Sequence, residues 1–276
     1  MDILESWVAQ LLVEGKSAQT LRSYRSVVSR YMASGLTPFR FLMQAQAKGC
    51  NPASIALYIR VLRRWELWLE RQGLGTPSLN GLKVPRVRPQ IVRPFTGQEI
   101  TRLLEVCAHG FLGERDRAII LFLLDSGLRA SELLSLAVAD LGADGRVRVQ
   151  GKGSKWRMVR VGARTLAQVE MYLSLRRVPS PALWVGINGV PLHVRGLGSR
   201  LCNLGKKAGV HCHPHRFRHT FATFCLLNGA DCRLVQELLG HATPAQTQRY
   251  TQAVDSMWAV ERFSSFGPVD RLLSGG

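Results

Sequence analysis

The sequence predicts a mainly α-helical protein in two parts: a bundle of four short helices, and a larger mixed α/β domain that is mostly helical with a small antiparallel sheet. Two observations lead to this fold class. Apolar residues recur at helical spacing along most of the 276 residues, in segments that glycine, proline and capping residues separate. One pair of segments, near residues 146–149 and 156–161, instead alternates as strands do, around a glycine-rich turn.

The first predicted domain covers residues 1–82 and contains the four amphipathic helices. Apolar residues at helical spacing run from residue 3 to residue 13, and three further helical segments follow. Their boundaries are marked by glycines, by capping side chains and by a proline at a helix start, namely Gly15, Ser17, Gly35, Pro38 and Asn51. Short helices of this kind bury their apolar faces against one another, so a small helical bundle is expected.

Residues 83–95 are predicted to form an extended linker. Three prolines disfavour both a helix and the interior of a sheet, and basic side chains follow one another along the segment. A second domain, predicted over residues 96–276, then begins with a helix, because Thr96 and Glu99 can form a capping box. Two further helices are expected at residues 114–124 and 128–136, and two strands at residues 146–149 and 156–161. Helices are expected again from Ala163 to the end.

The charge balance predicts a nucleic-acid partner. Lys and Arg number 37 against 19 Asp and Glu, which gives a formal net charge of +18. Residues 1–88 hold 13 basic and 5 acidic side chains and the rest of the chain holds 24 and 14, so both domains could contact phosphate. Candidate contacts on the fourth helix and in the linker are Arg60, Arg63, Arg64, Arg86 and Arg88. For the three arginines of the fourth helix, an ordinary solvated face is the alternative.

The chain is expected to be cytoplasmic and associated with the nucleoid. Its first residues lack the basic start and apolar run of a signal peptide, and no apolar stretch is long enough to cross a bilayer. In that compartment, the six cysteines are expected to be reduced thiols rather than a disulfide framework.

Two motifs in the second domain could serve a phosphate. Arg129 is expected in the first turn of a helix, at the positive end of its dipole, with Glu132 on the same face. Lys152 stands between two glycines at the strand turn, where a ligand can approach the backbone closely. The alternatives are a surface ion pair and an exposed turn lysine. A Walker-type loop is excluded, because no Ser or Thr follows the lysine and a strand comes next.

Histidines and arginines are dense over residues 211–219. Pro214 can begin a helix on which His215 and Arg218 share one face. Three phenylalanines are expected on a different, buried face: Phe217, Phe221 and Phe224. A rival interpretation is a zinc site with ligands from among His211, Cys212, His213, Cys225 and Cys232. Their spacing matches no familiar zinc pattern, so no metal is predicted.

The last motif contains a histidine and a tyrosine. A helix that begins near Asp231 is expected to end at Gly240, and His241 follows directly. Tyr250 comes nine residues later, near the far end of a short predicted helix. Considered alone, Tyr250 could equally be a half-buried packing residue.

Together, these motifs resemble the tyrosine recombinase (phage integrase) family. The family's order is G-L-R-x-x-E, G-K-G on a hairpin, H-x-x-R-H, L-G-H and a tyrosine nine residues later, and all five occur here with fitting spacings. The resemblance covers residues 96–250, and the four-helix start is similar to the family's core-binding domain. Because the chain begins almost directly with these helices, the resemblance implies a simple, Xer-like member without an arm-binding domain.

The resemblance implies an enzyme that cuts and rejoins DNA without metal, ATP or other cofactor. Tyr250 would attack a phosphodiester, form a 3′-phosphotyrosine and release a 5′-hydroxyl. The family's phosphate donors match Arg129, Arg218 and His241, and its general acid matches Lys152. Two further positions of the family match His215 and Glu132. Among these, Lys152 would be the general acid, His215 would accept the tyrosine proton or bind phosphate, and Glu132 would orient its neighbours.

Members of this family act as homotetramers on two double-stranded DNA sites and pass through a Holliday junction. The implied uses are dimer resolution, or integration and excision of a mobile element. Residues 251–276, too apolar for a free end, would dock on a neighbouring protomer unless they pack on their own chain. The rival functions are a type IB topoisomerase, which the separate helical domain disfavours, and a DNA-binding protein with an inactive site, which the complete residue set disfavours.

Overall fold

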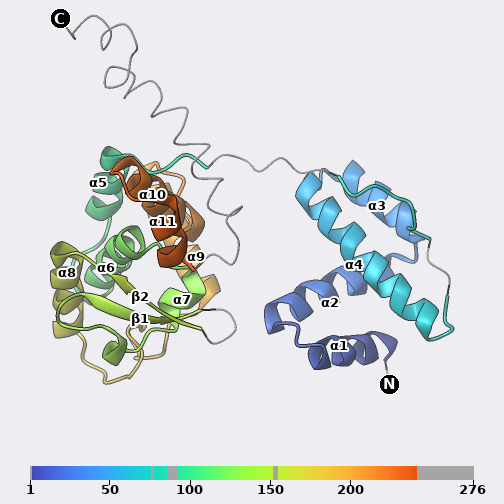
Figure 1. Cartoon of the computed structure of the whole chain (residues 1–276), viewed down its shortest axis with the longest axis horizontal. Helices are drawn as coiled ribbons and strands as arrows, with labels where there is room; N and C mark the ends of the chain where they lie inside the picture. Colours follow the sequence, from blue (N-terminus) through green and yellow to red (C-terminus); the bar gives the residue numbers. More distant parts are fainter. Residues whose placement is uncertain (1, 76–77, 86–91, 152–154, 241–276) are drawn as a thin grey trace, which may run out of the picture. The chain divides into compact units, whose positions relative to one another are not determined.

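The structure is a computed structural model that describes residues 2–75, 78–85, 92–151 and 155–240 (Figure 1). The chain divides into two compact units, Met1–Gln90 and Ile91–Gly276, each with its own hydrophobic core. Both units are mostly helical, which confirms the predicted fold class. The candidate residues that lie outside the described residues are Arg86, Arg88, Lys152, His241, Tyr250 and the tail 251–276.

The first unit contains the four predicted helices. They are α1 (Ile3–Val13), α2 (Ala18–Ser34), α3 (Pro38–Ala47) and α4 (Pro52–Arg71). The Ser17 side chain accepts a hydrogen bond from the Thr20 N–H, and the Asn51 side chain accepts one from the Ser54 N–H. These caps satisfy backbone donors that have no partner inside the helix, which is why α2 and α4 begin where the sequence predicts.

Aromatic side chains fill the core of the first unit. The ring centroid of Trp7 on α1 lies 5.1 Å from that of Trp65 on α4 and 5.9 Å from that of Tyr24 on α2. Val61 and Leu62, in the middle of α4, are completely buried. α4 packs against α2 and α3 and buries more residues than any other helix of this bundle.

The three candidate arginines of α4 have different surroundings. Arg60 is exposed, and its Nε donates to the Ala56 carbonyl oxygen of its own helix. The Arg63 Nε donates to the Leu79 carbonyl oxygen, and Arg64 forms an ion pair with Glu14 of α1. Arg63 and Arg64 therefore bond to other segments of the bundle, while the hydrogen bond of Arg60 stays within its own helix.

Both ends of the predicted linker pack on a unit. Val84 lies against the core of the first unit, and Phe95 is buried in the core of the second. Arg216 of the second unit donates to the carbonyl oxygens of Arg93 at 3.0 Å and Pro94 at 3.2 Å, and its guanidinium carbon lies 4.0 Å from the Phe95 ring centroid. The end of the linker is therefore fixed to the second unit.

The second unit begins with the predicted capping box of Thr96 and Glu99. Its elements, with one short 3-10 helix η1, are α5 (Gly97–Glu105), α6 (Phe111–Ser126), α7 (Ala130–Leu134), η1 (Val138–Asp140), β1 (Arg146–Gln150), β2 (Trp156–Arg160), α8 (Ala163–Ser174), α9 (Val194–Ala208), α10 (Pro214–Leu227) and α11 (Cys232–Leu239). The strands form the predicted antiparallel pair, with Val149 opposite Arg157.

α6 is the central helix of the second unit. It packs against α8 and α10, and its residues Ile120, Phe122 and Leu123 are completely buried (Figure 1). The hairpin lies beside α7 and contacts α11 through β2. The start of α7, the strand β2 and the end of α11 therefore meet at one place, although they are far apart in the sequence.

The structure corrects three expectations about helices in this unit. α6 begins at Phe111, a turn before residue 114. α7 spans only Ala130–Leu134, so Arg129 is its N-cap residue and does not lie in its first turn. Residues 175–193 are not helical. Three prolines in that stretch remove backbone donors and disfavour a continuous helix.

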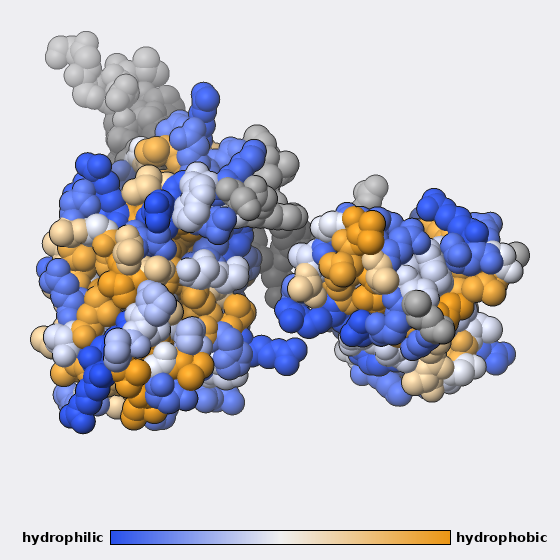
Figure 2. All heavy atoms as spheres, turned by 90° about the horizontal axis from the view of Figure 1, so that it is seen from below, coloured by the Kyte–Doolittle hydropathy of each residue, from blue (hydrophilic) through white to orange (hydrophobic). Residues whose placement is uncertain are grey.

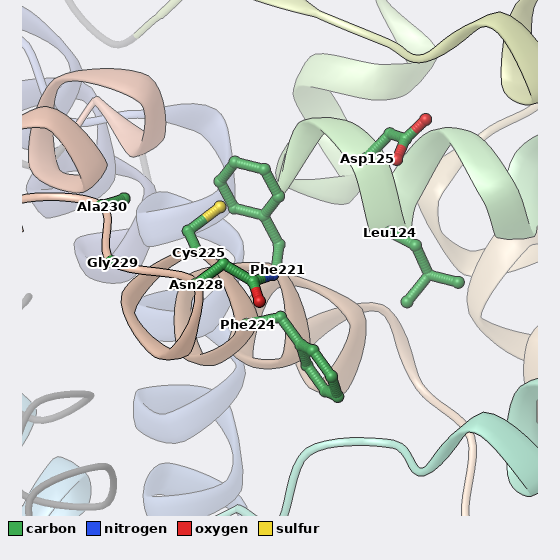
Figure 3. A pocket seen from close by; sticks show the side chains of 8 residues that line it. All are labelled: Leu124, Asp125, Phe221, Phe224, Cys225, Asn228, Gly229 and Ala230. Carbon is green, nitrogen blue, oxygen red and sulfur yellow. The ribbon is translucent and has the colours of Figure 1, made fainter. Parts of the chain in front are cut away.

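Hydrophilic and apolar side chains are mixed on the surface of both units (Figure 2). One hollow of the second unit, with a volume of about 560 Å³, lies where α6 and α10 end (Figure 3). Its lining combines apolar side chains, among them Leu124, Phe221 and Phe224, with the polar side chains of Asp125 and Asn228. Phe224, expected on a buried face, is 44% exposed here, because no described element covers that side of α10. None of the helices that the structure describes is long and apolar enough to span a membrane.

Candidate active site

Arg129 lies at the N-terminal end of α7. Its backbone is extended, with φ −70° and ψ 151°, and its N–H donates to Glu132 Oε2 at 2.9 Å. Its Nη1 donates to Glu132 Oε1 at 2.8 Å, and the side chain is 40% exposed. An arginine that is anchored through one nitrogen, partly open to solvent and close to the positive end of a helix is suited to donate to an anion.

Glu132 is the centre of a cluster of charges. It is 6% exposed and accepts hydrogen bonds from Nη1 and Nη2 of Arg157, at 3.2 and 2.8 Å, in addition to those from Arg129. The Nη1 of Arg218 lies 4.0 Å from Oε2. Burial alone would raise the pKa of Glu132, but the hydrogen bonds from Arg157 and Arg129 outweigh it and hold the pKa below its ordinary value. Glu132 is thus an anion that organises three guanidinium groups.

Arg218 is on α10 and is only 2% exposed. Its Nη1 donates to the Gly127 carbonyl oxygen at 2.8 Å, and its Nη2 donates to the Leu239 carbonyl oxygen at 2.7 Å. Gly127 has φ 60°, and a Cβ there would lie 2.3 Å from the Phe221 ring, so a glycine is required for α6 to end this close to α10. One guanidinium therefore fixes the ends of both α6 and α11.

His215 precedes Arg218 by one turn of α10, and its side chain is accessible to solvent. Partial burial of the ring lowers the pKa of His215, and the positive charges of Arg218 and Arg129 lower it further. Its imidazole is therefore neutral near pH 7 and can accept a proton. The structure thus brings four of the predicted site residues into one neighbourhood: Arg129, Glu132, His215 and Arg218.

The other three predicted site residues, Lys152, His241 and Tyr250, lie outside the described residues. For Lys152 and His241, the structure describes the neighbouring elements of the chain. Lys152 follows β1 and precedes β2 in the chain, and His241 comes directly after Gly240, which ends α11. β2 and the end of α11 both take part in the cluster around Glu132.

Sequence reasoning missed Arg157. Along β2, Arg157 and Val159 point to the inner face of the hairpin, and their neighbours on either side are exposed. An arginine at an inward position of a strand needs an anionic or carbonyl partner, because an unpaired buried charge is costly. That break in the alternation was the available signal, but the sequence does not say which partner it has.

The histidines before α10 belong to the rival zinc-site interpretation. The ring centroids of His211 and His213 lie 5.0 Å apart. Cys212 between them is buried, and this burial raises the pKa of its thiol to about 12, which disfavours the thiolate that binds metals. Within the described ranges, no group of three or more His, Cys, Asp or Glu side chains is placed to hold a metal ion.

The chain is similar in sequence to known recombinases. The model of the phage integrase family matches residues 93–257. The tyrosine recombinase XerA of Pyrococcus furiosus is 34% identical over 261 residues, which cover 91% of this chain and 89% of that protein. The tyrosine recombinase XerC of Salmonella typhi is 37% identical over 218 residues, which cover 76% of this chain and 73% of that protein.

Solved structures share its fold. A crystal structure of XerA recombinase, 28% identical, matches with a TM-score of 0.56 over 94% of this chain and 98% of that one. The site-specific recombinase XerH, bound to a palindromic difH substrate in a post-cleavage complex, matches with a TM-score of 0.72 over 94% of this chain and 83% of that one. At 19% identity, the XerH match is a statement about fold alone.

Proposed function

The chain belongs to the phage integrase family, and from this membership we propose that it is a site-specific tyrosine recombinase that cuts and rejoins double-stranded DNA. The observation that carries the proposal is the cluster in which Glu132 holds Arg129 beside Arg218, with His215 nearby. Guanidinium groups donate to phosphate oxygens in a fixed, planar geometry, and a neutral imidazole beside them can take up a proton. The net charge of +18 suits a DNA substrate.

The proposed reaction begins with Tyr250. Its hydroxyl oxygen bonds to a DNA phosphorus while the bond from that phosphorus to the 5′-oxygen breaks. His215 accepts the tyrosine proton, and Lys152 gives a proton to the departing 5′-oxygen. The products are a 3′-phosphotyrosine and a 5′-hydroxyl. The reverse steps with a new 5′-hydroxyl rejoin the strand, and the phosphotyrosine bond conserves the energy that this step needs.

We assign the stabilisation of the transition state to three donors. Negative charge accumulates on the non-bridging phosphate oxygens during the attack, and Arg129, Arg218 and His241 would donate hydrogen bonds to them. Losing one preorganised donor of this kind costs about 3 kcal/mol, or about 100-fold in rate. Glu132 contributes by holding the guanidinium groups close together despite their like charge. The mechanism assigns no step to a metal, ATP or another cofactor.

A pH profile tests the role of His215. The cleavage rate should decrease on the acid side with its midpoint below about pH 6.5, because the pKa of His215 lies below the ordinary histidine value. The measurement is the second-order rate constant for single-turnover cleavage at protein concentrations below the Kd for DNA, which reports the pKa of the free protein. It is made for the wild type and for His215→Gln, which should lack the acidic decrease. A wild-type rate that has already halved above about pH 6.5 would contradict this role.

A supercoiled plasmid with two copies of the recombination site tests the proposed function. The site is first located by footprinting the full chain on the DNA that flanks its gene. We expect two circles with exchanged flanks from a plasmid with directly repeated sites, and no exchange from a plasmid without them. Relaxation without exchange would indicate a topoisomerase, and binding without either product would indicate an inactive DNA-binding protein. Both results would overturn the proposal.

The proposal includes a homotetramer on two duplexes, a Holliday junction, and docking of the tail 251–276 on a neighbouring protomer. The apolar side chains of that tail are Met257, Trp258, Val260, Phe263 and Phe266. The hollow between the ends of α6 and α10 offers apolar partners for them in Leu124, Phe221 and the exposed Phe224, beside the polar Asp125 and Asn228 (Figure 3).

Two variants and their mixture test this docking. Deletion of residues 251–276 and the substitution Phe224→Asp should each prevent assembly of the tetramer on DNA, measured by analytical ultracentrifugation. Mixing the two variants should restore part of the assembly, because the Phe224→Asp chain supplies a tail and the truncated chain supplies an intact hollow. Assembly that survives the deletion, or a mixture without recovery, would contradict docking between protomers.

The same proposal covers the remaining candidate residues and the biological use. Arg60, Arg63, Arg64, Arg86 and Arg88 are proposed to contact the DNA backbone, which positions the protein without reading sequence. Recombination would serve either the resolution of dimers or the integration and excision of a mobile element, in the cytoplasm and at the nucleoid.

A further inference from the structure

Arg157 is the one member of the charged cluster that no motif of the family resemblance includes. It lies on the inner face of β2, opposite Val149 of β1, and its side chain is 14% exposed. Lys152 lies between β1 and β2 in the chain, five residues before Arg157. Arg157 is therefore close in sequence to the proposed general acid.

All three nitrogens of the Arg157 guanidinium donate to groups of the protein. Nη1 and Nη2 bind the two carboxylate oxygens of Glu132, at 3.2 and 2.8 Å, and Nε binds the Leu238 carbonyl oxygen at 2.9 Å. A bidentate pair of this kind fixes distance and orientation together. Arg157 thus connects β2 to α7 and to the last turn of α11, which makes it a link between elements and not a ligand for phosphate.

The end of α11 is held from two sides. Arg157 binds the Leu238 carbonyl, and Arg218 binds the next one, that of Leu239. Gly240 follows in a left-handed conformation with φ 62°, and a Cβ on it would lie 3.1 Å from Nη1 of Arg157. The glycine allows the guanidinium to approach the backbone here. The next residue in the chain is His241.

Arg157 also affects how Glu132 shares its charge. Glu132 has two oxygens and three guanidinium neighbours, and Arg157 takes one bond on each oxygen. Without Arg157, the buried carboxylate would attract Arg129 more strongly, because it would lose its bidentate partner. Arg129 donates to Glu132 from Nη1 of its side chain and is otherwise partly exposed, so Arg157 favours an Arg129 that remains directed toward solvent.

We propose that Arg157 is a positioning residue for DNA cleavage: its guanidinium holds the hairpin, Arg129 through Glu132, and the end of α11 in one arrangement. The inference rests on the proposed recombinase function. Misplacement of reacting groups by about 1 Å can lower a rate about 100-fold. Arg157→Ala should therefore lower the single-turnover cleavage rate about 100-fold at saturating DNA, while the Kd for DNA stays within about threefold of the wild type.

The experiment uses the full chain and a nicked duplex made from the footprinted site. Arg157→Ala leaves a space of the size of the lost group. Guanidinium ion added at millimolar concentration should therefore raise the cleavage rate of this variant at least about tenfold. Arg157→Lys keeps the charge but has a compact ammonium that cannot form the bidentate pair and the third bond, so it should cleave as slowly as Arg157→Ala. A purely structural role predicts no rescue at fixed temperature.

Arg176 provides the matched control. Like Arg157, it donates three hydrogen bonds, in this case all to backbone carbonyls, those of Val178, Ser180 and Ala182 in the loop after α8. Arg176→Ala removes a comparable set of bonds away from the cluster. It should lower the melting temperature without lowering the cleavage rate measured below that temperature.

The outcomes separate this inference from the proposed function. A wild-type chain that forms no covalent adduct would overturn the recombinase proposal. A wild-type chain that cleaves, together with an Arg157→Ala chain that cleaves equally well or fails only through a weaker Kd, would overturn the positioning role alone. Equal losses of cleavage rate in Arg157→Ala and Arg176→Ala would also overturn the positioning role alone. If Arg157→Ala does not fold, Arg157→Lys decides by the same two measurements, the rate and the Kd.

Discussion

We expect Tyr250→Phe to abolish covalent attachment of the protein to DNA while leaving DNA binding unchanged. Phenylalanine keeps the ring and loses only the oxygen that would bond to phosphorus. Removing the nucleophile of a covalent mechanism lowers the rate by about 10⁴-fold or more. The measurement uses a nicked suicide duplex, from which the short fragment with the 5′-hydroxyl diffuses away, so that the adduct accumulates and is seen on a denaturing gel.

Tyr24→Phe is the matched control for this prediction. It removes the same hydroxyl from a tyrosine of α2 whose ring stacks on Trp7, with 5.9 Å between the centroids. The stack persists in phenylalanine, so this variant should form adduct at the wild-type rate. Adduct formed by the Tyr250→Phe chain would show that another residue attacks the phosphate.

The second large effect concerns stability. Glu132→Gln should lower the free energy of unfolding by about 3–5 kcal/mol, because it leaves the guanidinium groups around a buried, neutral amide without their counter-charge. Three arginines contribute to that excess: Arg129, Arg157 and Arg218. Urea denaturation at pH 7 measures the difference. Cleavage should decrease as well, since Glu132 holds the groups that are proposed to bind phosphate.

The size of this effect should depend on pH in a defined direction. Burial raises the pKa of Glu132, but hydrogen bonds from Arg157 and Arg129 lower it by more. A carboxyl with a lowered folded-state pKa stabilises the protein fully above its unfolded value of about 4.3, and this contribution is lost as the pH falls through the folded-state pKa. The difference between wild type and Glu132→Gln should therefore be complete at pH 7 and shrink below about pH 4.

Glu5→Gln is the control for Glu132→Gln. Glu5 pairs with Arg25 at 2.6 Å, and the two side chains are 47% and 49% exposed. Pairs at the surface contribute about 0–1 kcal/mol, so this variant should be nearly as stable as the wild type. A loss as large as that of Glu132→Gln would mean that burial is not the reason for the effect.

Local signals in the sequence located most helix boundaries of this protein. Ser17, Asn51, Thr96 and Asp231 were expected at helix starts, and in each case the side chain accepts a hydrogen bond from an N–H of the first turn. Such a cap acts within three residues of the chain and depends little on the rest of the fold. The same holds for Gly240 at the end of α11, whose left-handed conformation is intrinsic to glycine.

Expectations failed where the result depends on distant elements. Phe224 has the spacing of a buried residue. Which faces of α10 are covered depends on the elements that pack beside it, and no described element covers the face that carries Phe224. Arg129 was expected inside α7. The helix begins one residue later, because Glu132 reaches back to bind the Arg129 N–H, and the same carboxylate is fixed by Arg157 of β2.

The chemical groups of the candidate site and their order along the chain, including Arg129, Arg218 and Tyr250, can be read from short motifs with fixed spacing. Which of these groups share a partner depends on how distant segments pack. Arg157 lies 25 residues from Glu132 and 81 from Leu238, and Arg218 lies 91 from Gly127. Charges and carbonyls so far apart meet only after the helices pack, so no local pattern could assign Arg157 to this site.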